Sequence, residues 1–122
     1  MIQYNLFLDD ERVPLDVTNF SQDPIYKELP WQIVRTALSF KAAITEQGMP
    51  DVVSFDNDIQ DFSGEQGAEI TGYMLAHWLI NYCIDHSIKF PRVVKAHSRN
   101  CVDQPKILGT FDNAHRFYPE LV

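Results

Sequence analysis

A short apolar stretch that ends in adjacent acidic residues is the feature that most constrains this fold. Residues 6–8, Leu-Phe-Leu, are followed at once by Asp9, Asp10 and Glu11. Residues 52–56, VVSFD, repeat the pattern and end on Asp56. Short apolar runs of this length, bounded by turn-forming residues, predict buried strands. Three adjacent carboxylates repel one another, so they belong either in a solvated turn or beside a positive charge.

The rest of the chain alternates between strand and helix patterns. We expect strands over residues 3–8, 31–35, 52–56 and 92–96, and helices over residues 37–47, 71–87 and about 103–116. Thr36 and Thr71 are natural helix caps. One alternative joins residues 31–47 into a single helix. Prolines and polar residues predict an irregular loop over residues 13–30, and glycines predict a flexible loop over residues 60–70. The alternation indicates an α/β layer fold with a mainly parallel sheet.

In such folds ligands bind outside the carboxyl ends of the strands. Most residues suited to chemistry fall at those ends: Asp9, Asp10, Glu11, Arg12, Arg35, Asp56, Asp58, His97, Ser98 and Asn100. This convergence is more informative than any single motif, because each residue alone also has a purely structural explanation.

Asp9, Asp10 and Asp56 are the candidate metal ligands. Hard divalent cations prefer carboxylate oxygens, so Mg²⁺ or Mn²⁺ is the expected cofactor. Such an ion bridges phosphate oxygens and lowers the pKa of a bound water. The structural alternative is that each Asp forms a turn or caps a helix.

The other strand-end residues suit a phosphate. Arg12 and Arg35 offer planar donor forks, with surface ion pairing as the alternative. His97 is the candidate general acid or base, and its alternative role is to support the neighbouring loop. Ser98 and Asn100 can donate hydrogen bonds to phosphate oxygens, or cap the last helix.

Length and charge narrow the function classes. A chain of 122 residues is one domain, residues 1–122, by the usual size prior. The net charge of −7 argues against duplex DNA and anionic membranes as partners. The chain shows no signal peptide, no membrane-spanning stretch and no zinc spacing of its cysteines, so we expect a cytoplasmic protein. No glycine-rich phosphate loop or dinucleotide fingerprint is present, which excludes typical kinases and Rossmann dehydrogenases.

The ordered motifs resemble the cyclic-phosphate-processing receiver domains, a divergent branch of the response-regulator receiver fold. The resemblance covers about residues 4–115 and is carried by LFLDDERVP, WQIVRTA, VVSFDNDI, TGYMLAHWL and KAHSRN. It implies a flavodoxin-like, receiver-like three-layer fold with a mainly parallel four- or five-stranded sheet. It also implies that the first helix is reduced to a loop, consistent with residues 13–30.

The resemblance also implies roles for the strand-end residues. In ordinary receivers the acidic pair binds Mg²⁺ and the Asp after the third strand accepts a phosphoryl group, and these positions match Asp9, Asp10 and Asp56. The residues on the family's other characteristic positions are Arg12, Arg35, Asp58, Thr71, His97, Ser98 and Asn100. Asn57 stands where the family usually has a His.

Three functions follow as hypotheses. The first is a metal-dependent phosphoesterase that opens a cyclic phosphate on a small nucleotide or RNA end, with His97, Asp58 and Asp56 as catalytic residues. The second is a module that binds a cyclic nucleotide without cleaving it. The third is a receiver that is phosphorylated on Asp56. The absence of an output domain fits a bacterial or phage protein acting on a diffusible small molecule. The oligomeric state is left open.

Overall fold

The computed structural model describes residues 3–97 and 103–122. Its strands are β1 (Asn5–Leu8), β2 (Gln32–Val34), β3 (Val52–Phe55) and β4 (Val93–Ala96). Its α-helices are α1 (Pro14–Val17), α2 (Ile25–Glu28), α3 (Ala37–Gln47), α4 (Gly72–His86) and α5 (Asp103–Phe117). Two short 3₁₀ helices, η1 (Glu65–Gly67) and η2 (Pro119–Leu121), complete the described part of the chain.

The four strands form one parallel sheet in the order β2-β1-β3-β4. Leu8 lies beside Val34 on one side and Phe55 on the other, and Phe55 lies beside Ala96. The four carboxyl ends are therefore level at one edge of the sheet. The predicted α/β class with a parallel sheet is confirmed, and the described residues supply four strands.

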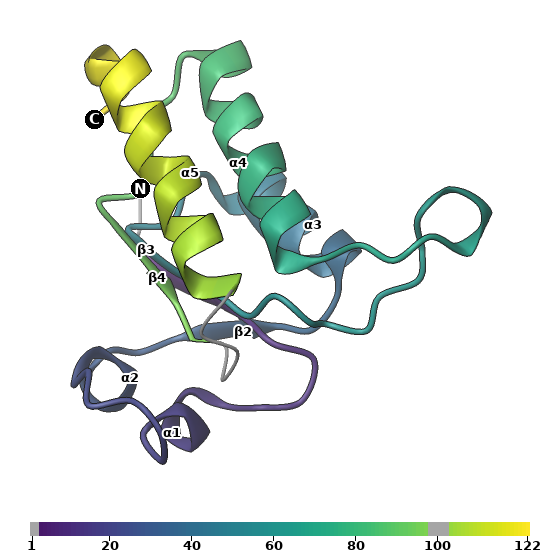
Figure 1. The fold of residues 1–122 in the computed structure, drawn as a ribbon. Coiled ribbons are helices and arrows are strands. Elements are labelled where there is room, and N and C mark those ends of the chain that lie inside the picture. The colour runs from purple at the N-terminus through teal and green to yellow at the C-terminus, as the bar shows by residue number, and fades with distance from the viewer. Residues whose placement is uncertain (1–2, 98–102) are drawn as a thin grey trace.

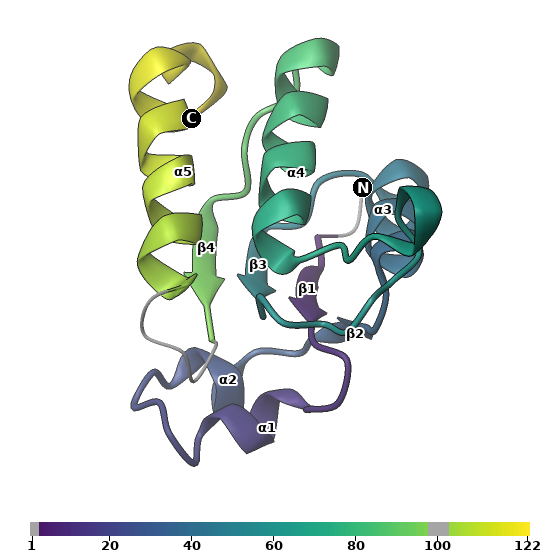
Figure 2. The same ribbon diagram turned by 45° about the vertical axis from the view of Figure 1, so that its right-hand side comes forward.

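Alternating residues of the strands divide the core between two faces of the sheet. Leu6, Leu8 and Phe55 belong to the larger core cluster, which they form with residues of α3, α4 and α5. Phe7 points the other way and packs with Val17 of α1 and Tyr26 of α2. The three long helices thus lie on one face and the two short ones on the other (Figures 1 and 2). This three-layer arrangement is that of a receiver-like fold.

The segment 13–30 is more ordered than the irregular loop that its prolines predicted. It contains α1 and α2, each only four residues long. The Asp16 carboxylate accepts the Val13 N–H at 2.9 Å, and Asp23 accepts the Ile25 N–H at 3.1 Å. These local bonds stabilise single turns because the side chains of Asp readily accept backbone N–H groups at helix starts.

Residues 31–47 form a strand followed by a helix, so the single-helix alternative is wrong. Thr36 separates β2 from α3 with an extended backbone, and its hydroxyl oxygen accepts the Ser39 N–H. Thr71 starts α4 in the same way by accepting the Met74 N–H. Both predicted caps are confirmed, and they fix where the long helices begin relative to the strand ends.

A loop over residues 57–70 connects β3 to α4 and extends away from the body of the molecule (Figure 1). We call it the projecting loop. Expected to be flexible, it contains η1 and is closed by an antiparallel bridge between Asp61 and Ile70. No helix in the described ranges is both long and apolar enough to cross a membrane.

Candidate metal and phosphate site

Three carboxylates meet at the carboxyl edge of the sheet. Asp9 and Asp10 follow β1, and Asp56 follows the neighbouring strand β3. One oxygen from each of the three lies within 4.8 Å of the others. Asp9 and Asp56 are only 1% and 4% exposed, and Asp10 is half-buried. The predicted cluster is therefore formed, and we call it the carboxylate cluster.

The electrostatics of this cluster are unfavourable without a cation. Burial, together with the negative charge of Asp9, raises the pKa of Asp56 to about 7. Burial also raises the pKa of Asp10. Burial opposes ionisation of Asp9 as well, but hydrogen bonds from His97 and from the Arg12 and Glu11 amides outweigh it and lower its pKa to about 2. Clustered carboxylate oxygens with an electrostatic need for positive charge fit Mg²⁺ or Mn²⁺.

A buried chain of hydrogen bonds holds the Asp9 carboxylate on the side of the sheet that faces α1 and α2. The Tyr26 hydroxyl lies 2.6 Å from Ser54 Oγ, and Ser54 Oγ lies 2.7 Å from His97 Nδ1. On the other side of the ring, His97 Nε2 lies 3.1 Å from Asp9 Oδ2. We call these four residues the His97 relay. It fixes the orientation of Asp9, whose other oxygen, Oδ1, accepts the Glu11 and Arg12 amides at 2.9 and 2.8 Å.

The relay places His97 differently from its predicted role as general acid or base. The imidazole is 1% exposed and stacks on Phe7, with ring centroids 4.3 Å apart and planes 7° apart. Burial lowers its pKa, which the bond to Asp9 only partly offsets. Both ring nitrogens are hydrogen-bonded inside the protein, Nε2 to Asp9 and Nδ1 to Ser54.

Both predicted arginines lie beside the cluster. Arg12 Nη1 is 3.5 Å from Asp9 Oδ2, and its guanidinium lies over the Phe20 ring at 5.4 Å. Arg35 Nη1 donates to the carbonyl oxygens of Asp9 and Arg12, at 3.3 and 2.8 Å. Arg35 thus holds the acidic segment after β1 in place, and both guanidinium groups are only half-buried.

The other predicted site residues that the structure describes are Asp58 and Thr71. Asp58 is exposed, and its negative charge contributes to the raised pKa of Asp56. Thr71 serves as a helix cap. Asn57 reinforces the start of α4, because its side-chain oxygen accepts the Tyr73 N–H at 3.0 Å. Ser98 and Asn100 lie outside the described residues.

A cavity of about 680 Å³ lies next to the carboxylate cluster, and we call it the acidic pocket. It is bounded by the segment after β1, the start of α3 and the projecting loop. Its lining residues are Asp10, Glu11, Arg35, Thr36, Ile59, Gln60, Asp61, Phe62 and Ser63. Asp10 and Arg35 belong to both the pocket and the cluster surroundings, so the two are continuous. The volume is in the range of pockets that hold small molecules.

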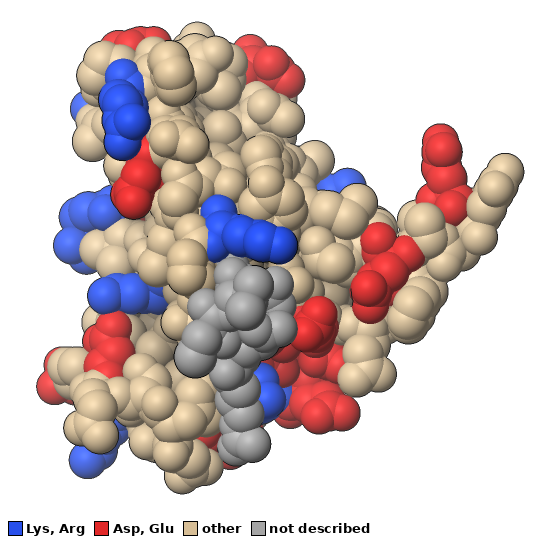
Figure 3. Space-filling model, viewed as in Figure 1, with Lys and Arg blue, Asp and Glu red and all other residues tan. Residues whose placement is uncertain are grey.

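Acidic side chains gather where this pocket lies. In Figure 3 they are concentrated beside the carboxyl edge of the sheet and along the projecting loop, whereas Lys and Arg are more frequent over the rest of the visible face. An anion therefore meets a negative field at this edge unless a cation is present.

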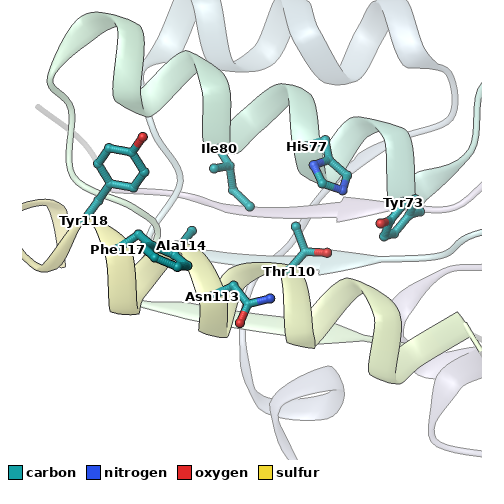
Figure 4. A pocket seen from close by; sticks show the side chains of 8 residues that line it. All are labelled: Tyr73, His77, Ile80, Thr110, Asn113, Ala114, Phe117 and Tyr118. Atoms are coloured by element: carbon teal, nitrogen blue, oxygen red, sulfur yellow. The ribbon is translucent and has the colours of Figure 1, made fainter.

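A second cavity lies between α4 and α5, and more aromatic residues line it than line the acidic pocket (Figure 4). It has a volume of about 550 Å³. Tyr73 lies at one end, Phe117 and Tyr118 lie at the other, and His77 lies between them. We call it the α4–α5 groove. None of the carboxylate cluster residues lines it.

Sequence reasoning missed three residues of this region. Ser54 and Tyr26 belong to the His97 relay, and Phe62 lines the acidic pocket. The available signals were a single polar residue inside the apolar strand VVSF and a single large apolar residue inside the polar loop QDFSG.

Comparison with protein families gives one match. Residues 4–113 match a family model described as the cyclic-phosphate processing receiver domain. No curated protein and no solved structure matches the chain. The matched range includes the carboxylate cluster, the His97 relay and the acidic pocket.

Proposed function

The chain belongs to the cyclic-phosphate processing receiver domain family, and we propose that it is a metal-dependent phosphoesterase that opens a cyclic phosphate on a small nucleotide. The observation that carries this proposal is the carboxylate cluster, whose three oxygens within 4.8 Å lie beside two guanidinium groups. Carboxylates and arginines together suit a metal ion and a phosphate held side by side.

Asp9, Asp10 and Asp56 would hold the divalent cation. When bound there, Mg²⁺ or Mn²⁺ would supply Lewis acidity toward a phosphate oxygen and a water of lowered pKa. The residues fit this ion because they offer only oxygen ligands, and because a bound cation would offset the burial and the negative charge of Asp9 that raise the pKa of Asp56.

The reaction is the hydrolysis of a cyclic phosphodiester to a phosphomonoester. A bond forms between water oxygen and phosphorus, the bond between phosphorus and one ring oxygen breaks, and the released oxygen takes up a proton. Arg12 and Arg35 would orient the phosphate and balance the charge that develops on its oxygens. Asp58 would accept a proton from the attacking water, a role supported by its exposure and by the effect of its charge on the pKa of Asp56.

In this proposal His97 is a positioning residue. Its Nε2 binds Asp9 while its Nδ1 is bound to Ser54, so the ring keeps Asp9 Oδ2 in one orientation. Partners of metal ligands commonly have this effect on ligand orientation and basicity.

Binding without cleavage is the second candidate, and a specific observation favours it. Asn57, where family members usually have a His, is engaged in capping α4. His97 is 1% exposed, so neither of these positions places an accessible imidazole beside the substrate. A protein of this kind would retain a cyclic nucleotide unchanged. In either case, we propose a cytoplasmic protein with a small nucleotide as partner.

The deciding experiment is incubation with a panel of 2′,3′- and 3′,5′-cyclic nucleotides and a short RNA ending in a 2′,3′-cyclic phosphate. Each is incubated with Mg²⁺, Mn²⁺ or EDTA and analysed by mass spectrometry. Hydrolysis adds one water to the ligand and is expected only with metal. Metal-dependent binding of an unchanged ligand would replace the enzyme proposal with the binding module. Labelling of the protein by a small phosphodonor, lost in Asp56→Asn, would instead support a receiver.

A further inference from the structure

We infer that the acidic pocket receives the nucleobase and sugar of the substrate, and that Phe62 is the residue on which the base stacks. This inference rests on the proposed function and deepens it, because it assigns the substrate class as a nucleoside carrying one cyclic phosphate. It is carried by the position of Phe62, the way its loop is fixed, and the continuity of the pocket with the carboxylate cluster.

Within the described part of the chain, no packing role explains a large apolar side chain at Phe62. It is 62% exposed and belongs to neither core cluster. Its neighbours in sequence are polar or charged, and the loop extends away from the body of the molecule (Figure 1). An exposed aromatic ring that lines a cavity offers a flat apolar surface, which suits a nucleobase of any identity.

The residue before Phe62 fixes the loop to the rest of the site. Asp61 accepts the Ala37 N–H at 2.7 Å and the Ser63 N–H at 3.0 Å through its carboxylate. Its backbone oxygen also accepts the Ile70 N–H at 2.7 Å. Gln60 adopts a φ of 50°, a left-handed conformation that is uncommon for a residue other than glycine. The backbone on both sides of Phe62 is therefore held in one conformation beside the pocket.

The pocket leads directly from the carboxylate cluster. Asp10 is part of the cluster, Arg35 holds the segment that carries it, and both line the pocket. A phosphate held at the cluster would therefore leave its attached sugar and base in the pocket, on the side of Phe62. Gln60 and Ser63 also line the pocket, and offer hydrogen bonds to sugar hydroxyls or base edges.

The charge of the pocket narrows the substrate further. Glu11 and Asp61 line it in addition to Asp10, whereas Arg35 is the one basic residue among the described residues that line it. A neutral base is tolerated by such a lining, but a second phosphate is repelled by it. We therefore expect nucleosides with one cyclic phosphate to be preferred over nucleotides that carry additional phosphates.

The test compares ligands with and without a base on variants of Phe62. The ligands are 2′,3′-cyclic AMP and 2′,3′-cyclic CMP, an RNA trinucleotide ending in a 2′,3′-cyclic phosphate, and methyl riboside 2,3-cyclic phosphate, which has no base. Binding is measured by calorimetry with Mg²⁺ for the wild type, Phe62→Ala, Phe62→Trp and Phe117→Ala. Phe117 is a matched control, because it is 75% exposed and lines the α4–α5 groove instead.

Phe62→Ala is expected to weaken binding of the ligands with a base by about 5- to 100-fold and to leave the ligand without a base unchanged. Phe62→Trp should restore binding, and Phe117→Ala should have no effect. The mononucleotides should bind more tightly than the RNA end, whose additional phosphates meet the acidic lining of the pocket, and tighter binding of the RNA end would contradict the substrate class assigned here. Equal effects of Phe62→Ala on ligands with and without a base, or no effect on either, would overturn the inference while leaving the proposed function intact. If the wild type binds none of the ligands with metal, the proposed function and this inference fail together.

Discussion

His97 Nε2 lies 3.1 Å from Oδ2 of Asp9, a member of the carboxylate cluster, and both side chains are buried, each only 1% exposed. This contact joins a buried imidazole to a carboxylate that we propose as a metal ligand. On the far side of the ring, Ser54 and Tyr26 hold the imidazole in place. The cluster therefore depends on residues that no substrate would touch.

Breaking the relay should weaken metal binding. Ser54→Ala removes the partner of His97 Nδ1 and leaves the ring free to turn, so we expect the Mg²⁺ dissociation constant to rise by about 10-fold or more. Calorimetric titration with Mg²⁺ measures this directly. Tyr26→Phe, which removes only the outermost hydroxyl, should have a smaller effect. His77→Ala on the exposed face of α4 is the control, and the role of the relay would be contradicted if Ser54→Ala bound Mg²⁺ as tightly as this control.

In the metal-free protein, the stabilising contribution of the Asp56 carboxyl group should be lost as the pH rises from about 4 to about 7. Folding raises the pKa of Asp56 from 3.8 to about 7. The contribution of this group to the free energy of unfolding is therefore greatest below pH 3.8 and is lost as the pH rises through 7. Asp9 and His97 act in the opposite direction. The contribution of Asp9 is lost as the pH falls from 3.8 toward 2, and that of His97, whose pKa burial lowers, is lost as the pH falls below 6.5, so the Asp56 contribution is isolated by comparison with a variant. Urea unfolding in EDTA at several pH values measures how the free energy of unfolding changes with pH.

Asp56→Asn should remove most of this pH dependence and should stabilise the metal-free protein at pH 8. Asp112→Asn, an exposed substitution on α5, is the matched control. Mg²⁺ should raise the unfolding temperature of the wild type more at pH 8 than at pH 5, because protons compete for the same carboxylate. If the Asp56→Asn variant and the wild type showed the same dependence of unfolding free energy on pH, the Asp56 carboxyl group would not be the cause of that dependence.

Gly72 should not tolerate a side chain. A Cβ at this position would overlap the carbonyl oxygen of Asp56, because the Gly72 N–H donates to the Asn57 carbonyl and brings α4 close to the end of β3. Gly72→Ala should reduce the free energy of unfolding by about 2–3 kcal/mol. Gly109→Ala in α5 meets nothing within 4 Å and should instead increase it by about 0.5–1 kcal/mol. Chemical denaturation of both variants distinguishes the overlap of a Cβ with the Asp56 carbonyl from a general effect of replacing glycine. Equal changes in the free energy of unfolding of the two variants would contradict this account.

Arg35 should be needed as an arginine and not only as a positive charge. Its Nη1 atom donates to two backbone oxygens of the acidic segment, and a lysine ammonium making the same two bonds would have no second nitrogen to offer a phosphate. Arg35→Lys should weaken binding of the cyclic phosphate by about 10-fold, which corresponds to loss of one charge-assisted hydrogen bond. Arg92→Lys, at the opposite end of the sheet beside Asp51, is the matched control. Equal affinities of the two variants would contradict the role assigned to Arg35.

The parts of the fold that depend on local patterns could be predicted from the sequence. The helix over residues 37–47 begins and ends as its cap and glycine predict. The strands predicted over residues 31–35 and 52–56 are present as β2 and β3. The carboxylate cluster could also be predicted, because parallel strands in register place Asp9 and Asp56 side by side.

The surroundings of the cluster depend on which side of the sheet each residue faces, and this was harder to predict. Lys95 and His97 point away from the long helices, toward the layer of α1 and α2. That layer lies in a segment whose prolines suggested no regular structure, so nothing indicated that Tyr26 and Phe7 would bury the imidazole. The acidic pocket was missed because its position depends on the path of the projecting loop, which is fixed by non-local contacts such as the bond from the Ala37 N–H to Asp61.

The central claim is that the carboxylate cluster holds a divalent cation that acts on a cyclic phosphate, and ³¹P NMR tests it most directly. A cyclic nucleotide is followed over time with wild type or Asp10→Asn, in Mg²⁺ or in EDTA. We predict that the cyclic phosphodiester resonance converts to a monoester resonance with wild type in Mg²⁺, that EDTA stops the conversion, and that Asp10→Asn slows it by at least about 100-fold. A cyclic resonance that persists with wild type in Mg²⁺, or that disappears equally fast in EDTA, would contradict the account.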